Sequence, residues 1–86
     1  MREVVYERID PIKIFKRDNW KCKLCDIDTP RTLRGTIEDN APELDHIMPL
    51  ALGGSHTANN VQCLCRKCNC DKGYINPEEY LNKKQA

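Results

Sequence analysis

The sequence predicts a small α+β domain that is stapled by a bound zinc ion. The chain has 86 residues, and so short a chain buries too little surface for its core alone to give a comfortable stability margin. It holds six cysteines but only one Phe and one Trp, so metal ligands or disulfides must supplement the packing. Two helix-start signals flank apolar stretches that are typical of strands. We expect a single domain over residues 1–86.

The first helix is predicted over residues 11–18. Asp10 can accept hydrogen bonds from the first backbone N–H groups, and Pro11 costs nothing at the first helical position because its missing donor would be unpaired there. Ile12 and Phe15 are expected on one side of this helix, with the basic residues facing outward.

The middle of the chain is expected to be loop followed by two strands. Residues 26–43 are polar and irregular, with room for one short strand at most. Residues 44–50 read as a strand, Gly53 and Gly54 supply a turn, and residues 61–65 read as the returning strand.

Two more helices are expected after the second strand. One covers residues 68–72 and is capped by Gly73. The other covers residues 77–84, because Asn76 and Pro77 repeat the helix-start signature. At the opposite end, Val4, Val5 and Ile9 give the first nine residues a strand-like character. This segment could pair within the chain or with a partner chain, so a homodimer is possible.

The composition limits the class of protein. A net charge of +1 argues against a strong non-specific polyanion binder, although basic residues cluster locally, for example at Arg31 and Arg34. We predict no membrane span, since no apolar run approaches the roughly 18 residues that a span needs. The first ten residues lack the pattern of a secretion signal, so we expect a cytoplasmic protein.

The cysteine spacing predicts a structural zinc site. In a reducing compartment, paired C-x-x-C cysteines are more often metal ligands than disulfide partners. Two such pairs can present four thiolates to one tetrahedral ion and leave no open position. The pairs are Cys22 with Cys25 and Cys65 with Cys68. Cys63 is expected to be a small core residue, and Cys70 could be buried or exposed.

The order of these motifs resembles that of the HNH endonucleases, which have the ββα-metal, or His-Me finger, fold. The resemblance is carried by CKLC, ELDHIMPLALGG, NNVQCLC and RKCNCDKG, and it covers residues 20–73. The last position of the H-N-H triplet is Asn69 here, which makes the chain an H-N-N variant. The resemblance implies a ββα-metal unit flanked by the predicted N- and C-terminal helices.

The resemblance also implies a catalytic role for four residues. Asp45 and Asn69 would bind a catalytic divalent cation, His46 would be the general base, and Asn60 would orient His46. Histidine suits that task because its usual pKa, near 6.5, leaves much of it neutral. The amide oxygen of Asn69 is a harder ligand than an imidazole nitrogen, so we expect Mg²⁺ or Mn²⁺ rather than Zn²⁺ or Ni²⁺.

The strand geometry sets a condition on these roles. Neighbouring residues of a regular strand point to opposite faces, so Asp45 and His46 reach one phosphate only if the strand is bent there or the metal lies off its end. We therefore predict a local irregularity at this dipeptide. His56 is expected to be a loop residue without a role. For Lys72 and Arg66, phosphate contact and a solvated helix face are equally plausible.

Two functions of different classes follow. The first is a metal-dependent DNA endonuclease of low sequence specificity, with the ββα unit at the minor groove. The second is a non-enzymatic zinc-ribbon module that binds nucleic acid or protein, with Asn69 as the sign of a decayed site. The sequence does not choose among restriction, homing and phage-packaging roles. One active site cuts one strand, so a double-strand break would need a dimer or two successive events.

Overall fold

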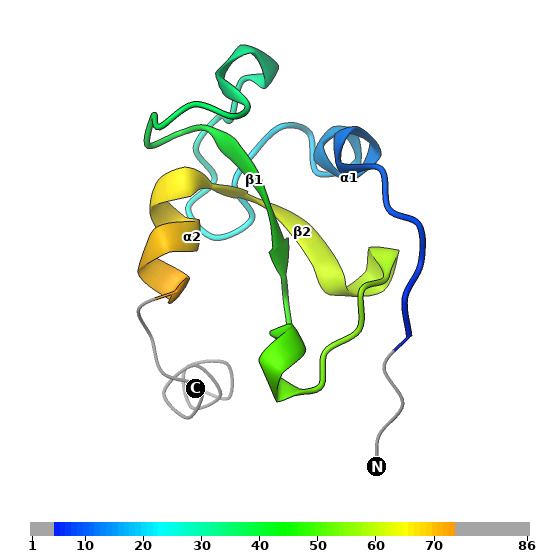
Figure 1. Cartoon of the computed structure of the whole chain (residues 1–86). Helices are drawn as coiled ribbons and strands as arrows, with labels where there is room; N and C mark the ends of the chain where they lie inside the picture. The colour runs from blue at the N-terminus through cyan, green and yellow to red at the C-terminus, as the bar shows by residue number, and fades with distance from the viewer. Residues whose placement is uncertain (1–4, 74–86) are drawn as a thin grey trace.

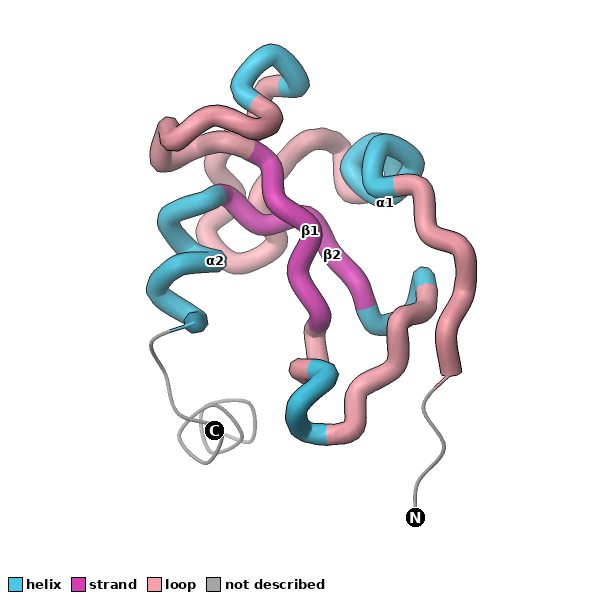
Figure 2. Tube along the Cα trace, in the orientation of Figure 1, coloured by secondary structure: helices cyan, strands magenta, loops and turns pink. Residues whose placement is uncertain are grey.

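The computed structural model describes residues 5–73. In this range the main elements are α1 (Pro11–Arg17), β1 (Pro42–His46), β2 (Val61–Cys65) and α2 (Arg66–Gly73). Figure 1 places β1 and β2 at the centre, with α1 on one side and α2 on the other, and both helices contact both strands. The long connections are mostly loop (Figure 2). The predicted α+β class is confirmed. The helix predicted at 77–84 lies outside the described residues.

Helix α1 begins where the sequence predicts. The side chain of Asp10 accepts a hydrogen bond from the backbone N–H of Ile12 at 3.0 Å, and a proline occupies the first turn. The helix ends at Arg17, one residue earlier than predicted, and its buried residues are Ile14 and Phe15. Phe15 is buried, as predicted for the inward side; Ile12 is partly buried and lines one cavity with Phe15, and Ile14, which the prediction did not name, is buried as well.

The two strands form an antiparallel hairpin whose register runs from Pro42 opposite Cys65 to His46 opposite Val61. The second strand, Val61–Cys65, has the predicted bounds, and all five of its residues are buried. The first strand was predicted at 44–50 but covers Pro42–His46. It starts two residues earlier because a proline is tolerated at the first position of a strand.

Strand β1 stops at His46 for a physical reason. The ladder gives one more bond, from the Ile47 N–H to the Asn60 carbonyl at 2.8 Å. The side chain of Asn60 then takes both backbone groups of Met48, and the next residue, Pro49, has no N–H to continue a ladder. The chain turns instead through a short 3-10 helix at Leu50–Leu52 and through Gly53, whose φ is +89°.

Helix α2 starts two residues before the predicted position, directly after β2. The sulfur of Cys65 accepts a hydrogen bond from the backbone N–H of Cys68 at 3.4 Å. A side-chain acceptor at this place satisfies a donor that the first turn of a helix leaves unpaired. Cys65 is thus the last residue of β2, and its sulfur caps the first turn of α2.

The loop between α1 and β1 has a 3-10 turn at Arg31–Leu33 and, within the described residues, no strand of its own. It is anchored by Thr29, which is fully buried. The Thr29 N–H donates to the Trp20 carbonyl at 2.8 Å, and its hydroxyl lies 3.3 Å from the sulfur of Cys63. This contact holds the loop on the hairpin.

The N-terminal segment pairs within the chain. Tyr6 and His56 form an isolated parallel bridge. The His56 N–H donates to the Val5 carbonyl at 2.9 Å, and the Glu7 N–H donates to the His56 carbonyl at 2.7 Å. Of the two possibilities that the sequence left open, residues 5–7 take the intramolecular one. Within the described residues, no helix is long and apolar enough to cross a membrane.

An ion pair joins α1 to β2. Arg17 holds the carboxylate of Asp18 through Nε at 2.9 Å, and a second arginine nitrogen donates to the Val61 carbonyl at 2.7 Å. Asp18 is buried and accepts the Cys63 N–H at 2.9 Å. Burial opposes its ionisation, but Arg17 and the Cys63 N–H outweigh this and hold the pKa of Asp18 below its usual value.

We predict that Asp18→Asn lowers the free energy of unfolding by about 1–3 kcal/mol at neutral pH, because an amide cannot satisfy both donors as a carboxylate does. The stability contributed by the charge is present above the usual carboxyl pKa and is lost as the pH falls through the lower folded-state value. Urea unfolding of zinc-saturated protein at several pH values measures this difference.

The matched control is Asp28→Asn. Asp28 pairs with Lys21 at 2.8 Å, but 76% of its side chain is exposed. Such surface pairs contribute about 0–1 kcal/mol. Equal effects of the two substitutions would show that the Asp18 pair does not anchor α1.

Candidate active site

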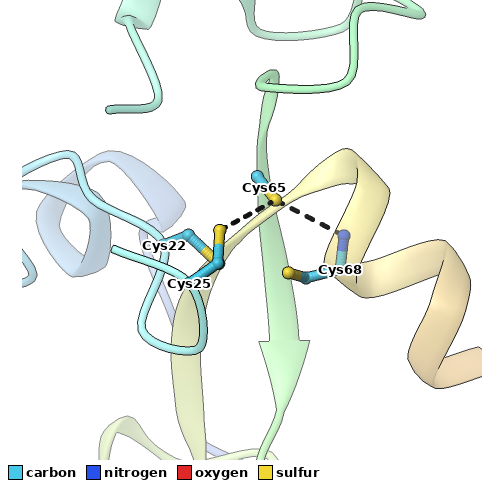
Figure 3. Close-up of side chains that lie close together, drawn as sticks. All are labelled: Cys22, Cys25, Cys65 and Cys68. Carbon is cyan, nitrogen blue, oxygen red and sulfur yellow. Dashed lines mark hydrogen bonds between the residues drawn. The ribbon is translucent and has the colours of Figure 1, made fainter. Parts of the chain in front are cut away.

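Four cysteine sulfurs converge from two distant parts of the chain (Figure 3). Cys22 and Cys25 lie in the loop after α1, Cys65 ends β2, and Cys68 lies in the first turn of α2. The four sulfurs lie within 4.8 Å of one another, and those of Cys25 and Cys65 are 3.8 Å apart. With Zn–S bonds of about 2.3 Å, a tetrahedral site has sulfur separations of roughly 3.8 Å. The predicted ligand set therefore fits a structural zinc ion.

The four sulfurs can all be ionised together only if a cation lies among them. Burial raises the pKa of Cys65 and of Cys68, and the neighbouring sulfurs raise that of Cys68 further. Burial also opposes ionisation of Cys22, but backbone hydrogen bonds from Cys65, Cys25 and Leu24 outweigh it and lower the pKa of Cys22 to about 7. Four adjacent thiolates repel one another unless a metal ion balances their charge.

The other two cysteines lie outside this cluster. Cys63 is fully buried next to Thr29, as predicted for a core residue. Cys70 is partly buried, and its sulfur accepts a hydrogen bond from Arg66 at 3.2 Å. Arg66 therefore has an intramolecular partner in addition to solvent.

Asp45 lies in a buried ion pair that the sequence did not predict. Lys72 Nζ lies 2.8 and 2.7 Å from the two carboxylate oxygens, and Gln62 Nε2 donates to one of them at 2.9 Å. The side chains of Lys72 and Asp45 are only 10% and 7% exposed. The same ammonium donates to the His46 carbonyl at 2.6 Å. Lys72 is thus neither a solvated helix-face charge nor, in this state, a phosphate contact.

The predicted irregularity at Asp45 and His46 is wrong. The ladder runs without interruption through both residues, with Asp45 opposite Gln62 and His46 opposite Val61. The side chain of Asp45 accordingly meets α2, whereas that of His46 meets the loop that carries His56. A regular ladder counts against a shared phosphate within the strand. Only the space beyond the end of β1 can be reached from both faces.

His46 has a partner that sequence reasoning missed. Its Nε2 lies 2.9 Å from Nδ1 of His56, and the two ring centroids are 5.2 Å apart. Burial lowers the pKa of His46, and the neighbouring His56 lowers it further, whereas Asp45 opposes the shift. Both effects favour the neutral imidazole that a proton acceptor needs.

Asn69 is held by Glu43. Its Nδ2 donates to Oε1 of Glu43 at 2.7 Å. Because the nitrogen is committed to this carboxylate, the amide oxygen is the atom of Asn69 that can bind a cation. No sequence pattern pointed to Glu43, which lies on β1 while Asn69 lies on α2.

Asn60 bridges backbone groups across the hairpin. Its Oδ1 accepts the Met48 N–H at 2.9 Å, and its Nδ2 donates to the carbonyls of Met48 and Ser55 at 2.9 and 2.7 Å. Gly54 makes this possible, since a Cβ there would overlap the Met48 carbonyl and lie 2.9 Å from Asn60 Nδ2. These three bonds of Asn60 are all to backbone groups, so any influence of Asn60 on His46 passes through the loop.

A cavity of about 360 Å³ opens at the end of β1. Asp45, His46, Asn69 and Lys72 line it together with the apolar turn at Leu50–Leu52. Asn60 is not among the residues that line this cavity; it bonds to Met48 and Ser55 on either side of the turn. A second cavity is lined by Arg31 and Arg34, and it shares Leu44 and Asn69 with the first.

A model of a known protein family matches residues 22–84, and its description is HNH endonuclease. The chain belongs to the HNH endonuclease family. The match begins at the first zinc ligand and spans β1, β2 and α2. A comparison with curated proteins found no match.

Membership of the HNH endonuclease family supports a nuclease-type function and a nucleic acid substrate in general terms, and it implies a divalent catalytic metal. The residues present can be tested against that metal. Within residues 5–73, the four cysteines are the only group of three or more His, Cys, Asp or Glu ligands. An Asp and an Asn oxygen at one cavity nevertheless suit Mg²⁺, which keeps several waters and takes few protein ligands.

We predict that the four-cysteine site binds one zinc ion per chain and that Cys65→Ser abolishes stoichiometric binding together with the helical far-UV signal, because metal binding and folding are coupled in such sites. Metal analysis of purified protein measures the zinc content. Cys70→Ser is the control and should retain the ion. If Cys70→Ser lost the ion instead, the fourth ligand would have to be assigned to Cys70 rather than Cys68.

We also predict that Gly54→Ala destabilises the domain by about 1–3 kcal/mol or more, because its Cβ would overlap backbone atoms that cannot move without breaking the Asn60 bridge. Urea unfolding at fixed free zinc measures this. Gly73→Ala is the matched control, since a Cβ at Gly73 meets nothing within 4 Å. A Gly54→Ala variant as stable as Gly73→Ala would contradict the packing described for the turn.

Proposed function

We propose that this chain is a metal-dependent DNA endonuclease that hydrolyses phosphodiester bonds and nicks double-stranded DNA with low sequence specificity. The observation that carries the proposal is the cavity at the end of β1, which Asp45, His46 and Asn69 line together. These residues come from two elements, and their chemistry differs: two oxygen donors and one neutral imidazole. Family membership supplies the reaction class.

In this proposal Asp45 and Asn69 hold a hard divalent cation, Mg²⁺ or Mn²⁺, through a carboxylate and an amide oxygen. Such an ion would neutralise charge on the phosphate and on the leaving oxygen. Glu43 fixes the amide so that its oxygen is available. Lys72 neutralises Asp45 in the structure, so the ammonium must move aside or share the carboxylate when the cation binds.

His46 acts as the general base. It takes a proton from the attacking water, and the water oxygen then bonds to phosphorus as the bond to the 3′ oxygen breaks. The cavity at the strand end is the place where a phosphate could lie between the Asp45 face and the His46 face. Asn60 holds the turn that follows His46 through its bonds to Met48 and Ser55.

Binding of DNA is proposed to follow the basic residues next to the cavity. Arg31 and Arg34 line the neighbouring cavity, and arginines beside a scissile phosphate typically contact the adjoining backbone. The ββα unit would approach from the minor groove. One site cuts one strand, so a double-strand break requires two events or a homodimer.

A second function is favoured by one observation. The Lys72–Asp45 pair leaves the carboxylate fully compensated without a metal, as in a zinc-stapled module that binds nucleic acid but does not cut it. The two functions differ in their need for His46 as a proton acceptor.

We predict that purified, zinc-loaded protein nicks supercoiled plasmid with Mg²⁺ or Mn²⁺ and not with Zn²⁺ alone. His46→Ala and Asn69→Ala should each lower the rate by roughly 10²-fold or more, the usual cost of losing a general base or an ion ligand. Agarose electrophoresis at several metal concentrations measures nicking, and higher Mg²⁺ should partly rescue only Asn69→Ala.

Asn59→Ala is the matched control for Asn69→Ala, because Asn59 is exposed and lies away from the cavity lining. Its rate should equal that of the wild type. No cleavage with any metal by folded, zinc-loaded protein that still retards DNA would favour the binding module.

A further inference from the structure

The contact between His46 and His56 constrains the protonation of both rings. Their nitrogens are 2.9 Å apart, which is a hydrogen-bond distance and requires one proton between them. Two arrangements satisfy this geometry. Either His46 carries the proton on Nε2 and His56 accepts it, or His56 carries the proton on Nδ1 and His46 accepts it.

Only one arrangement leaves His46 able to act as a base. If His46 accepts at Nε2, its own proton lies on Nδ1 and neither nitrogen retains a lone pair for water. If His46 donates from Nε2, its Nδ1 is unprotonated and can take a proton. His56 thus decides which nitrogen of His46 can accept a proton.

His56 is held in place by the N-terminal segment. Its backbone N–H and carbonyl bond to Val5 and Glu7 at 2.9 and 2.7 Å, and the Glu7 carboxylate accepts the Ala58 N–H at 2.8 Å. The Tyr6 ring lies beside the imidazole, with centroids 6.4 Å apart. These contacts fix the position of His56 relative to the N-terminal segment and place its ring beside His46.

We propose that His56 is a positioning residue for His46: its Nδ1 accepts the Nε2–H of His46, which fixes Nδ1 of His46 as the proton-accepting nitrogen. This inference rests on the proposed nuclease function and extends it. When the O–H bond of water breaks, the proton goes to Nδ1 of His46 and the oxygen forms the new bond to phosphorus. The resulting imidazolium keeps its Nε2–H bonded to His56, while the 3′ oxygen leaves and takes a proton from solvent.

The arrangement follows the general logic of an oriented base, in which a third group sets the tautomer of the imidazole. A neutral ring at this place accepts one hydrogen bond and adds no negative charge. With Nδ1 bonded to His46 and its own proton on Nε2, the neutral His56 ring retains no lone pair for the cation that Asp45 and Asn69 are proposed to hold.

Two variants test the proposal. His56→Asn retains an amide oxygen near the place of Nδ1, and His56→Leu has a similar size without an acceptor. We expect His56→Leu to lower kcat about ten- to hundredfold, the usual effect of losing a group that orients a site residue, with KM within about threefold. His56→Asn should recover most of this loss. Equal zinc content and matching amide spectra serve as the folding control.

Nitrogen NMR of the zinc-loaded protein, with no second metal added, gives a readout that does not depend on activity. We expect wild-type His46 to be protonated on Nε2 and unprotonated on Nδ1 at a pH where both rings are neutral, His56→Asn to keep this state, and His56→Leu to show a mixture. A wild-type His46 protonated on Nδ1 would overturn the proposal. So would a His56→Leu variant with an unchanged tautomer and unchanged kcat.

These readouts separate the two proposals. An inactive wild type with the expected tautomer would refute the nuclease and leave the hydrogen-bond direction established. An active wild type with the opposite tautomer would refute the role of His56 alone.

Discussion

Four sulfurs that must meet at one point constrain the whole domain. The loop after α1 supplies Cys22 and Cys25, and the junction of β2 with α2 supplies Cys65 and Cys68, and Cys65 follows Cys25 by 40 positions in the sequence. A tetrahedral ion fixes both the separation and the direction of these segments. Because Asn69 follows the last ligand directly, the zinc staple also sets where α2 presents its side chains to β1. A core that contains a single phenylalanine could not hold this geometry alone.

The two faces of β1 divide the chemistry between different parts of the chain. On one face Asp45 meets α2, through Lys72. On the other face His46 meets the loop that contains His56, and that loop is bonded to residues 5–7. The candidate site is therefore complete only when α2, which follows the four-cysteine site, and residues 5–7 are both in place. The cavity lies at the strand end because alternation prevents both side chains from sharing one face.

The buried pair of Lys72 and Asp45 links stability to metal binding. A carboxylate that is only 7% exposed requires a cation close by, and in the structure the ammonium meets that requirement. A divalent ion at the Asp45 carboxylate would replace the Lys72 ammonium as the compensating charge, rather than bind a carboxylate that has no cation beside it. The domain can thus remain folded without a metal at Asp45, whereas the four-cysteine site fits an ion that serves the fold.

The sequence by itself determined the features that depend on neighbouring residues or on ligand spacing. Asp10 and Pro11 specify the start of α1, the buried run Val61–Cys65 specifies β2, and the two C-x-x-C pairs specify the zinc ligands. The tertiary structure alone decided that β1 ends at His46, that His56 bonds to His46, and that Glu43 and Lys72 hold Asn69 and Asp45. Each of these depends on hairpin register or on the placement of α2. Such long-range pairings are set by packing and by the zinc staple, which leave no periodic or local mark in the chain.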